Sequence, residues 1–454
     1  MKSLIKKIIP VSLLNQYHKI LAVAANYFYG RPSEKMIIIG VTGTNGKSTT
    51  VSLITKILEE AGYKVGATST TLFKIAEKEW LNNKKMTMLG RLSLQKMLRQ
   101  MVKANCQYAV IETSSQGIEQ FRHLGIHYDI CVFTNLTPEH IEAHGGFANY
   151  KAAKLKLFKH LERLKNKKLG NKKIEKGIVA NGDEEHAKEF LDFKIKEKII
   201  FGMNDNTQKF SIFNFQFSSS FNFLSALNIK FLSDGLSFEV NKVKFDLKLF
   251  GRFNIYNSLA AIAVAQTQKI DLQVCKEALE RVGGVPGRME FIETGKDFKV
   301  LVDYAPEPES MRQLFEAIES HGLVKQKIIH VFGSCGGGRD VARRPILGEL
   351  SARNAEACIV TNEDPYDDDP RLIIEQVAAG AIRAGKTEGK NLFKILDRRE
   401  AISLALKLAN PGDLVLLTGK GSEQAIMIAN GHKIPWDERR VVKEELNRLN
   451  NNNI

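Results

Sequence analysis

The stretch GVTGTNGKSTT (residues 40–50) overlaps the end of the apolar run MIIIGVT (36–42) and precedes a helical stretch. A strand, a glycine-rich loop and a helix in this order are typical of a phosphate-binding loop, because backbone amides and the helix dipole face the anion. Lys47 adds a positive charge, and the Ser48 hydroxyl can bind Mg²⁺. Val41 stands where the strict GxxxxGK[ST] motif has its first glycine, so the prediction depends on the strand–loop–helix context.

Two further apolar runs, YAVIETSS (108–115) and DICVFTNL (129–136), also end in small or polar residues. Open α/β sheets bind their ligands at the carboxyl ends of the strands. We therefore expect residues 36 onward to form βαβ units around a mainly parallel sheet, with a ligand at that edge.

The pattern changes twice further along the chain. Phenylalanine-rich alternation in FSIFNFQF (210–217) and GLSFEVNKVKFDL (235–247) predicts antiparallel hairpins appended to the first domain. A second α/β series follows GVPGRME (284–290), with the predicted strands KVLVDYA, KIIHVFGS, ACIVTNED, FKILD and DLVLLTGKG.

The predicted fold class is α/β: a central P-loop ATPase-type domain and a Rossmann-like C-terminal domain. The expected divisions are an N-terminal extension (1–35), an ATP-binding domain (36–287) and a C-terminal domain (288–454).

Composition favours a cytosolic multidomain enzyme. The 454 residues suit two or three domains, and the five cysteines are scattered without a CxxC pair. The net charge of +15 raises nucleic-acid binding as an alternative. However, the lysines concentrate in LERLKNKKLGNKKIEK (161–176), a solvated run without aromatics that could stack on bases. We therefore expect no nucleic-acid partner, and we expect a monomer.

The segment IIPVSLLNQYHKILAVAANYFYG (8–30) is apolar but is interrupted by polar residues and by Lys19. A membrane-spanning helix needs roughly 20 mostly apolar residues without charge, so crossing is not expected. Two interpretations stay open. The segment either packs on the enzyme body, or residues 1–30 touch the inner membrane surface as an interfacial helix.

The loop GTNGKST (43–49) resembles the ATP loop of the Mur ligases and folylpolyglutamate synthetases, and later motifs agree in order from 36 to 440. The closest resemblance is to the MurE branch, which adds the third residue of the peptidoglycan stem peptide. It implies an ATP-dependent amide ligase that uses Mg²⁺. The implied ATP-binding loop residues are Gly43, Thr44, Asn45, Gly46, Lys47, Ser48 and Thr49.

The resemblance also implies metal ligands besides Ser48. IETSSQG (111–117) is similar to the segment whose glutamate helps to hold Mg²⁺, here Glu112. FTNLTPEHIEAHGG (133–146) is similar to the segment whose histidine serves a second metal ion, here His140. YKAAKLKLF (150–158) is similar to the helix whose lysine is carbamylated by CO₂, here Lys154. Carbamylation would turn this cation into an anionic oxygen ligand.

Three further motifs are implied to contact the nucleotide. GRFNIYNSLAAIA (251–263) resembles the adenine-contacting helix, with Asn254 and Asn257 as polar contacts. Alternatively, the two asparagines are only an N-cap residue and a residue on the helix face. Arg288 and Asp303 match the arginine and aspartate near the γ-phosphate and ribose. An arginine there can neutralise charge on a transferred phosphoryl group.

The C-terminal motifs are implied to hold the incoming amino acid. Arg339, in GSCGGGRDVARRP (333–345), matches the arginine that binds its carboxylate. Gly419 and Glu423, in TGKGSE, would meet its distal amine, and Asp364 lies in the selectivity motif. Tyr366 replaces the arginine of diaminopimelate-adding enzymes, so the clamp for a second carboxylate is missing. Lysine or another diamine is then favoured.

Several residues depart from the family pattern: Pro306 and Gln116 replace histidines, Ser422 replaces the histidine of TGKGHE, and Glu139 replaces an aspartate. We also expect no family-type uridine-nucleotide domain, because only the short apolar segment precedes residue 36. The expected reaction joins a free amino acid to a muramyl-peptide acceptor through an acyl phosphate. The alternatives are a lipid-linked muramyl peptide, a polyglutamate or cyanophycin-like carboxylate, and a nucleotide-binding scaffold without catalysis.

Overall fold

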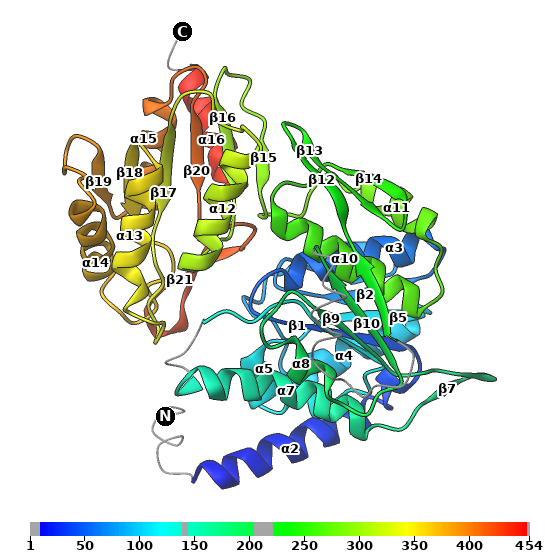
Figure 1. Ribbon diagram of the computed structural model, residues 1–454. Coiled ribbons are helices and arrows are strands. Elements are labelled where there is room, and N and C mark those ends of the chain that lie inside the picture. Colours follow the sequence, from blue (N-terminus) through cyan, green and yellow to red (C-terminus); the bar gives the residue numbers. More distant parts are fainter. Residues whose placement is uncertain (1–9, 139–143, 204–220, 452–454) are drawn as a thin grey trace.

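The computed structural model describes residues 10–138, 144–203 and 221–451. Within them the chain forms two α/β bodies that face each other, one coloured blue to green and the other yellow to red (Figure 1). The predicted α/β class is confirmed. The division at residue 288 stays a prediction.

The first body is built on a nine-stranded sheet in the order β11-β10-β9-β6-β1-β5-β2-β3-β4. Neighbouring strands are parallel except β2–β3 and β3–β4, which form an antiparallel edge that the sequence analysis did not predict. The strands are β1 (Ile37–Thr42), β2 (Val65–Thr68), β3 (Leu72–Ile75), β4 (Lys78–Leu81), β5 (Tyr108–Glu112), β6 (Ile130–Phe133), β9 (Gly177–Asn181), β10 (Glu197–Gly202) and β11 (Phe221–Ser225).

Helices cover both faces of this sheet, and each face has its own apolar core. α3 (Lys47–Glu60), α10 (Arg252–Thr267) and α11 (Leu272–Glu280) cover one face. The other face carries α4 (Arg91–Lys103), α5 (Ser115–Glu119), α7 (Phe147–Arg163), α8 (Ala187–Leu191) and the 3₁₀ turn η2 (Arg122–Gly125). The strands are therefore buried on both sides, which explains their continuous apolar runs.

A separate three-stranded antiparallel sheet, β12 (Leu227–Leu232), β13 (Gly235–Val240) and β14 (Val243–Leu247), packs against α11. The hairpin predicted at 235–247 is thus confirmed, with Phe238 opposite Phe245 on its buried face. The other predicted segment, 210–217, lies outside the described residues.

The second body has a six-stranded sheet in the order β15-β16-β20-β17-β18-β19, parallel except for β15. All five strands predicted for this region are present. The strands are β15 (Glu290–Ile292), β16 (Lys299–Val302), β17 (Ile328–Phe332), β18 (Ala357–Thr361), β19 (Leu392–Ile395) and β20 (Leu414–Leu417).

The helices of the second body also lie on both faces of its sheet. α12 (Pro308–Ser320), α13 (Arg343–Asn354) and α14 (Pro370–Arg383) pack on one face, and α15 (Arg398–Leu408) and α16 (Glu438–Asn451) on the other. The smaller elements are η1 (Pro32–Glu34), the hairpin β7 (Lys168–Leu169) and β8 (Lys172–Lys173), η3 (Ala429–Gly431), and the pair β21 (Ala425–Met427) and β22 (Lys433–Pro435).

The N-terminal helix α2 (Val11–Phe28) packs one side against α4 and η2, along the lower edge of Figure 1. Ala22 and Ala25 are buried in this contact, and the Ala22 carbonyl lies so close to Gly125 that a Cβ there would be 2.5 Å from it. The prediction of a helix packed on the enzyme body is therefore confirmed for this side. Within the described residues, no helix combines the length and the apolar character needed to cross a membrane.

One lysine of the lysine run, Lys167, is buried, contrary to our expectation of a solvated run. Its ammonium lies 2.6 Å from Asp129 Oδ2 and donates to the carbonyls of Ser33 and Met36. Asp129 also accepts the amide of Ile38 at the start of β1. Burial raises the pKa of Asp129 to about 6 and lowers the pKa of Lys167, so desolvation acts on both partners. The ion pair therefore holds the backbone at the start of β1, the strand that leads into the phosphate loop.

We expect Asp129→Ala to lower the free energy of unfolding by about 3 kcal/mol, because the buried Lys167 ammonium loses its anion. The double variant Asp129→Asn/Lys167→Met should recover more than half of this loss, since no buried charge remains. Urea denaturation followed by circular dichroism measures both. Glu175→Ala, which breaks an exposed pair with Lys173, is the control, with an expected change below about 0.5 kcal/mol. A similarly small loss for Asp129→Ala would contradict the prediction.

Candidate active site

The phosphate loop joins β1 to α3 and depends on two glycines. Gly46 has φ +79°, and a Cβ there would lie 2.2 Å from Asn257 Oδ1. A Cβ on Gly43 would lie 1.9 Å from Thr134 Oγ1. Both positions therefore need glycine, since neighbouring segments pack directly on the loop backbone.

Polar groups of other segments hold the loop in shape. The amides of Thr44 and Asn45 donate to Asn135 Oδ1 at 3.1 and 2.7 Å, and Lys47 Nζ donates to the Thr44 carbonyl at 2.5 Å. Asn135 follows β6, which pairs with β1 in parallel. Asn135 was not among the predicted site residues, although it lies in the predicted strand segment 129–136.

Glu112, at the end of β5, reaches the start of α3. Its buried carboxylate accepts the Ser48 hydroxyl at 2.8 Å, and the amide and hydroxyl of Thr70 at 2.6 and 3.0 Å. A hydroxyl and a carboxylate beside a phosphate loop are the oxygen ligands that suit Mg²⁺, which also keeps waters and phosphate oxygens in its shell. Ser48 and Glu112 therefore fit this metal ion.

Lys154, on α7, lies on the other side of the loop. It is 1% exposed, and its ammonium donates to the Gly43 carbonyl at 2.6 Å and lies 4.3 Å from the Tyr150 ring centroid. His140 lies outside the described residues, so its placement stays a prediction. His144, in the same motif, contacts Ser115 Oγ through Nε2 at 3.1 Å. Lys154 and the loop thus form one cluster.

Asn257 meets the loop from α10, and Asn254 lies behind it, outside the cavity lining. Asn257 Nδ2 donates to Asn254 Oδ1 at 2.9 Å, and Asn257 Oδ1 accepts the Thr50 hydroxyl at 3.3 Å. The alternative of an N-cap asparagine is wrong, because the N-cap of α10 is Gly251 and Asn254 lies inside the helix. Both side chains are buried at the contact between α10 and α3.

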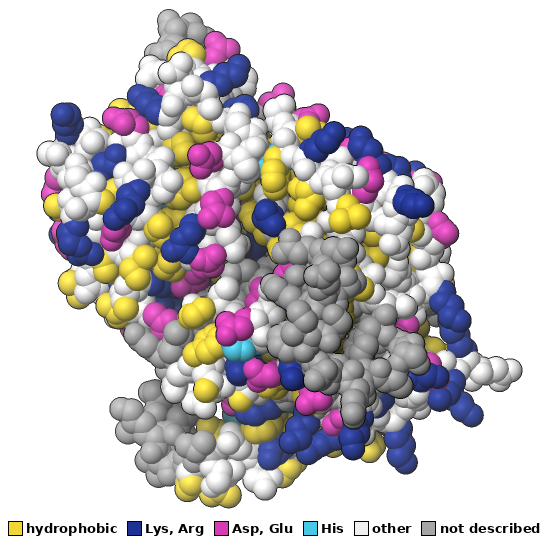
Figure 2. Space-filling view, in the orientation of Figure 1, with side chains coloured by type: hydrophobic (Ala, Val, Ile, Leu, Met, Phe, Trp, Pro, Cys, Tyr) yellow, Lys and Arg dark blue, Asp and Glu magenta, His cyan; other side chains and the backbone are white. Residues whose placement is uncertain are grey.

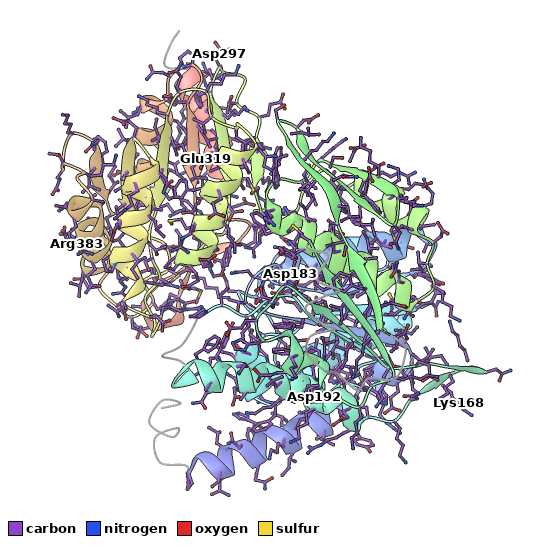
Figure 3. The ribbon with its side chains drawn as sticks, viewed as in Figure 1. Lys168, Asp183, Asp192, Asp297, Glu319 and Arg383 are labelled. Carbon is purple, nitrogen blue, oxygen red and sulfur yellow. The ribbon has the colours of Figure 1, made fainter. Side chains whose placement is uncertain are left out.

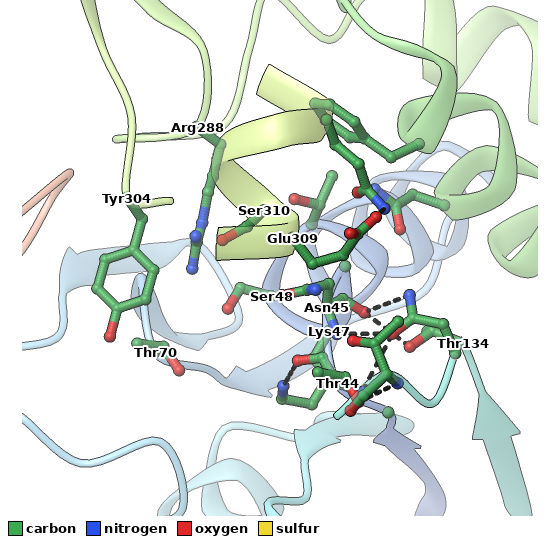
Figure 4. A pocket seen from close by; sticks show the side chains of 18 of the residues that line it. Thr44, Asn45, Lys47, Ser48, Thr70, Thr134, Arg288, Tyr304, Glu309 and Ser310 are labelled. Atoms are coloured by element: carbon green, nitrogen blue, oxygen red, sulfur yellow. Dashed lines mark hydrogen bonds between the residues drawn. The ribbon is translucent and has the colours of Figure 1, made fainter. Parts of the chain in front are cut away.

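Arg288 and Tyr304 extend toward this loop from the second body (Figure 4). The Arg288 guanidinium lies 4.4 Å from the Tyr304 ring centroid. Asp303 accepts the amides of Met289 and Ala305 at 2.7 and 2.8 Å, and burial raises the pKa of its carboxyl group despite the nearby Arg288. Asp303 therefore stiffens the turns that carry Arg288 and Tyr304.

A cavity of about 690 Å³ runs between the two bodies. Its lining joins Gly43 through Thr49, Glu112 and Lys154 to Arg288, Asp303 and Arg339 across the gap. Two of the departures from the family pattern, Gln116 and Pro306, also line it. The cavity thus brings the predicted nucleotide-binding residues, except Asn254, and the predicted carboxylate-binding arginine into one space.

The remaining predicted residues lie behind this space. The cavity lining, among the described residues, does not include Asp364, Gly419 or Glu423. Asp364 and Glu423 instead share two ammonium groups, Lys420 from the same body and Lys85 from the first body. A Cβ on Gly419 would lie 2.4 Å from Glu363 Oε2, so glycine lets this turn approach the acidic segment.

Sequence reasoning missed residues that only the tertiary structure places at the site. Thr70 and Lys85 come from segments without a motif, and Asp183, labelled near the centre of Figure 3, lies after β9 on the cavity wall. Asp183 accepts the Tyr256 hydroxyl at 2.9 Å. The parallel order of β6 and β9 could have indicated that the segment after β9 reaches the same edge.

Comparison with known families agrees with this division of the site. Residues 41–265 match the Mur ligase middle domain, and residues 287–421 match the Mur ligase glutamate ligase domain. The two matched regions carry the phosphate loop and Arg339 respectively.

Individual relatives cover most of the chain. A UDP-N-acetylmuramyl-tripeptide synthetase from Roseiflexus sp. is 39% identical over 437 residues, which cover 94% of this chain and 82% of the relative. A UDP-N-acetylmuramoyl-L-alanyl-D-glutamate–2,6-diaminopimelate ligase from Syntrophomonas wolfei is 35% identical, covering 94% and 81%.

Solved structures show the same fold. A UDP-N-acetylmuramoyl-L-alanyl-D-glutamate–2,6-diaminopimelate ligase aligns with a TM-score of 0.58 at 28% identity, covering 91% of this chain and 79% of the other. Mycobacterium tuberculosis folylpolyglutamate synthase complexed with ADP aligns with a TM-score of 0.65 at 16% identity, covering 90% and 94%. This chain belongs to the Mur ligase family of ATP-dependent acid–amino-acid ligases.

Proposed function

We propose that the protein activates a carboxyl group of a muramyl peptide with ATP and joins it to a free amino acid. The observation that carries this proposal is the cavity that links Lys47 and Ser48 on one wall to Arg288 and Arg339 on the other. Nucleotide, carboxylate and amine must meet for such a reaction, and one cavity between two bodies can align them.

The reaction has two steps. An oxygen of the peptide carboxylate attacks the γ-phosphorus of ATP, the bond to the β-phosphate oxygen breaks, and ADP leaves. The amine of the amino acid then attacks the acyl carbon, phosphate leaves with the bonding electrons, and the nitrogen loses a proton to form the amide. Lys47 and Arg288 stabilise the charge on the transferred phosphoryl group.

We assign the remaining nucleotide and substrate roles by position. Gly43 through Thr49 hold the phosphates, and Asn254 and Asn257 hold the base side of the nucleotide. Asp303 positions Arg288, and Arg339 receives the carboxylate of the incoming amino acid, where a planar guanidinium can bind it with two hydrogen bonds. Closure of the two bodies over the bound substrates would exclude water.

Ser48 and Glu112 would hold Mg²⁺, with His140 serving a second ion. The metal supplies positive charge to the phosphate oxygens. Lys154 contributes in a carbamylated form: its neutral amine nitrogen bonds the carbon of CO₂ and releases one proton. The product is an anionic oxygen ligand beside the loop.

The direct test incubates the protein with ATP, Mg²⁺, UDP-muramyl dipeptide and single amino acids, and measures ADP release and product mass. We expect ADP release that requires both acceptor and amino acid, and about 100-fold slower turnover in Lys47→Met, because a phosphate-binding charge is lost. Lys64→Met, an exposed lysine beyond α3, is the control. ATP binding without any amino-acid-dependent ADP release would contradict the proposal and favour a nucleotide-binding scaffold.

The carbamate on Lys154 has its own test. We expect wild-type turnover to fall in CO₂-free buffer and to return with bicarbonate. Lys154→Ala should be about 100-fold slower, whereas Lys154→Glu should retain part of the activity and lose the dependence on CO₂. Lys156→Ala, an exposed lysine of the same helix, should behave like the wild type. Full turnover of Lys154→Ala would remove the carbamate from the mechanism.

A second candidate acceptor is a lipid-linked muramyl peptide, and the exposed side of α2 favours it. Leu13, Tyr17, Ile20, Tyr27 and Phe28 are 58–79% exposed there, at helical spacing. Lys and Arg side chains gather close to this lower edge of the molecule (Figure 2). An apolar helix face beside basic residues suits the surface of an anionic bilayer. We propose that α2 lies on the inner face of the membrane and brings the site near such an acceptor.

Vesicle sedimentation tests this placement. We expect the protein to sediment with phosphatidylglycerol-containing vesicles, less so at high salt, and not with phosphatidylcholine alone. The double variant Ile20→Asp/Phe28→Asp should stay in the supernatant, because two charges then interrupt the apolar face. Leu232→Asp, at an exposed leucine of β12, is the control. Sedimentation of the double variant at the wild-type level would rule out α2 as the contact.

A further inference from the structure

The Asp364 and Glu423 carboxylates lie where the resemblance predicts the distal amine of the incoming amino acid, and an ammonium group of the protein is already there. Lys85 Nζ donates to Asp364 Oδ2 at 2.7 Å and also to Glu423 Oε2. The Lys85 and Asp364 side chains are 5% and 4% exposed. Lys85 belongs to the first body, so the contact crosses between the two bodies.

The loop that carries Lys85 is held in place by its own hydrogen bonds. Asn82, which is buried, donates from Nδ2 to the carbonyls of Ser69 and Met86 at 2.7 and 3.0 Å and accepts the Lys84 amide. Lys85 itself has φ +54°, an uncommon backbone conformation for a residue with a side chain. The tertiary structure therefore presents this ammonium group from an ordered turn between β4 and α4.

The charges of the cluster balance without any substrate. Lys420 Nζ donates to Asp364 Oδ1 at 2.9 Å, to Glu423 Oε2 at 3.0 Å and to the Ala425 carbonyl at 2.8 Å. Burial by itself would raise the pKa of Asp364, but Lys420 and Lys85 outweigh it and lower the pKa, so this carboxyl group is ionised. Two carboxylates face two ammonium groups, and a third cation would be uncompensated in a site that excludes water.

The cavity approaches this cluster only through Lys85. Lys85 and Arg339 line the cavity, whereas Asp364 and Glu423, within the described part of the chain, are not in its lining. An amino acid whose carboxylate binds Arg339 would therefore contact the Lys85 side chain before it could reach Asp364 or Glu423.

We infer that Lys85 is a specificity-determining residue: it occupies the distal-amine subsite, so the enzyme selects an amino acid whose side chain carries no cation. This inference rests on the proposed function and refines it, because it replaces the expected preference for lysine or another diamine. A cationic side chain enters only when Lys85 withdraws.

The test compares L-lysine with L-norleucine, which has the same side chain without the terminal ammonium group. Calorimetry in the presence of a non-hydrolysable ATP analogue measures binding, and the ratio of kcat/KM values for the two amino acids measures turnover. We expect the wild type to favour norleucine by about tenfold or more, because the ammonium group of lysine would be unpaired in the site. Lys85→Met should shift this ratio toward lysine by about tenfold or more. Lys85→Arg should keep the wild-type order.

Lys84→Met is the matched control, because Lys84 is the exposed neighbour in the same turn, and it should leave the ratio unchanged. Equal changes for both amino acids in Lys85→Met would overturn the inference and leave Lys85 as a contact between the bodies. A wild type that binds lysine at least as well as norleucine would also overturn it, as would binding of neither. Failure of the proposed function would give a different result, because neither the wild type nor any variant would then show amino-acid-dependent ADP release. The relative binding of lysine and norleucine would still test the role of Lys85.

Discussion

The parallel pairing of β1 between β5 and β6 is the constraint on which the site depends. The register places Val41 beside Glu112 and Thr42 beside Phe133, so the three strands end at the same level. Three of the residues that hold the phosphate loop and the start of α3 come from that edge: Glu112 from β5, and Thr134 and Asn135 just after β6. A shift of one residue in either pairing would move Glu112 or Asn135 away from the loop amides and hydroxyls.

Charge is distributed unevenly along the cavity. At the nucleotide end the cavity lining includes Lys47, Arg288 and, as an ammonium group, Lys154, with the buried carboxylates of Glu112 and Asp303. This arrangement suits several phosphate groups with Mg²⁺. At the far end the cations and carboxylates of the protein cancel. The two ends therefore differ physically, since one end attracts an anionic ligand and the other is already neutral.

The two bodies supply different residues to the cavity between them. The first body holds the nucleotide loop rigidly through backbone and buried side-chain contacts. The second body supplies Arg288 and Arg339, which line the cavity. Arg288 precedes strand β15, and Arg339 follows strand β17. Lys85 connects the two, so amino-acid choice and the approach of the bodies depend on the same side chain.

The sequence by itself determined which runs of each α/β series form buried strands, the phosphate loop, and the family. Buried parallel strands leave continuous apolar runs. The glycines at Gly43 and Gly46 form a short motif that is visible in the sequence, although the contacts that require them come from distant residues. The antiparallel edge β3–β4, the buried partner of Lys167, and the positions of Thr70, Asp183 and Lys85 were decided by tertiary structure alone. Apart from the local pairing of β3 with β4, each depends on a partner farther away in the chain: Lys85 meets Asp364 across 279 positions. Local composition cannot encode such a pairing, because it follows from strand register and from the way the two bodies face each other.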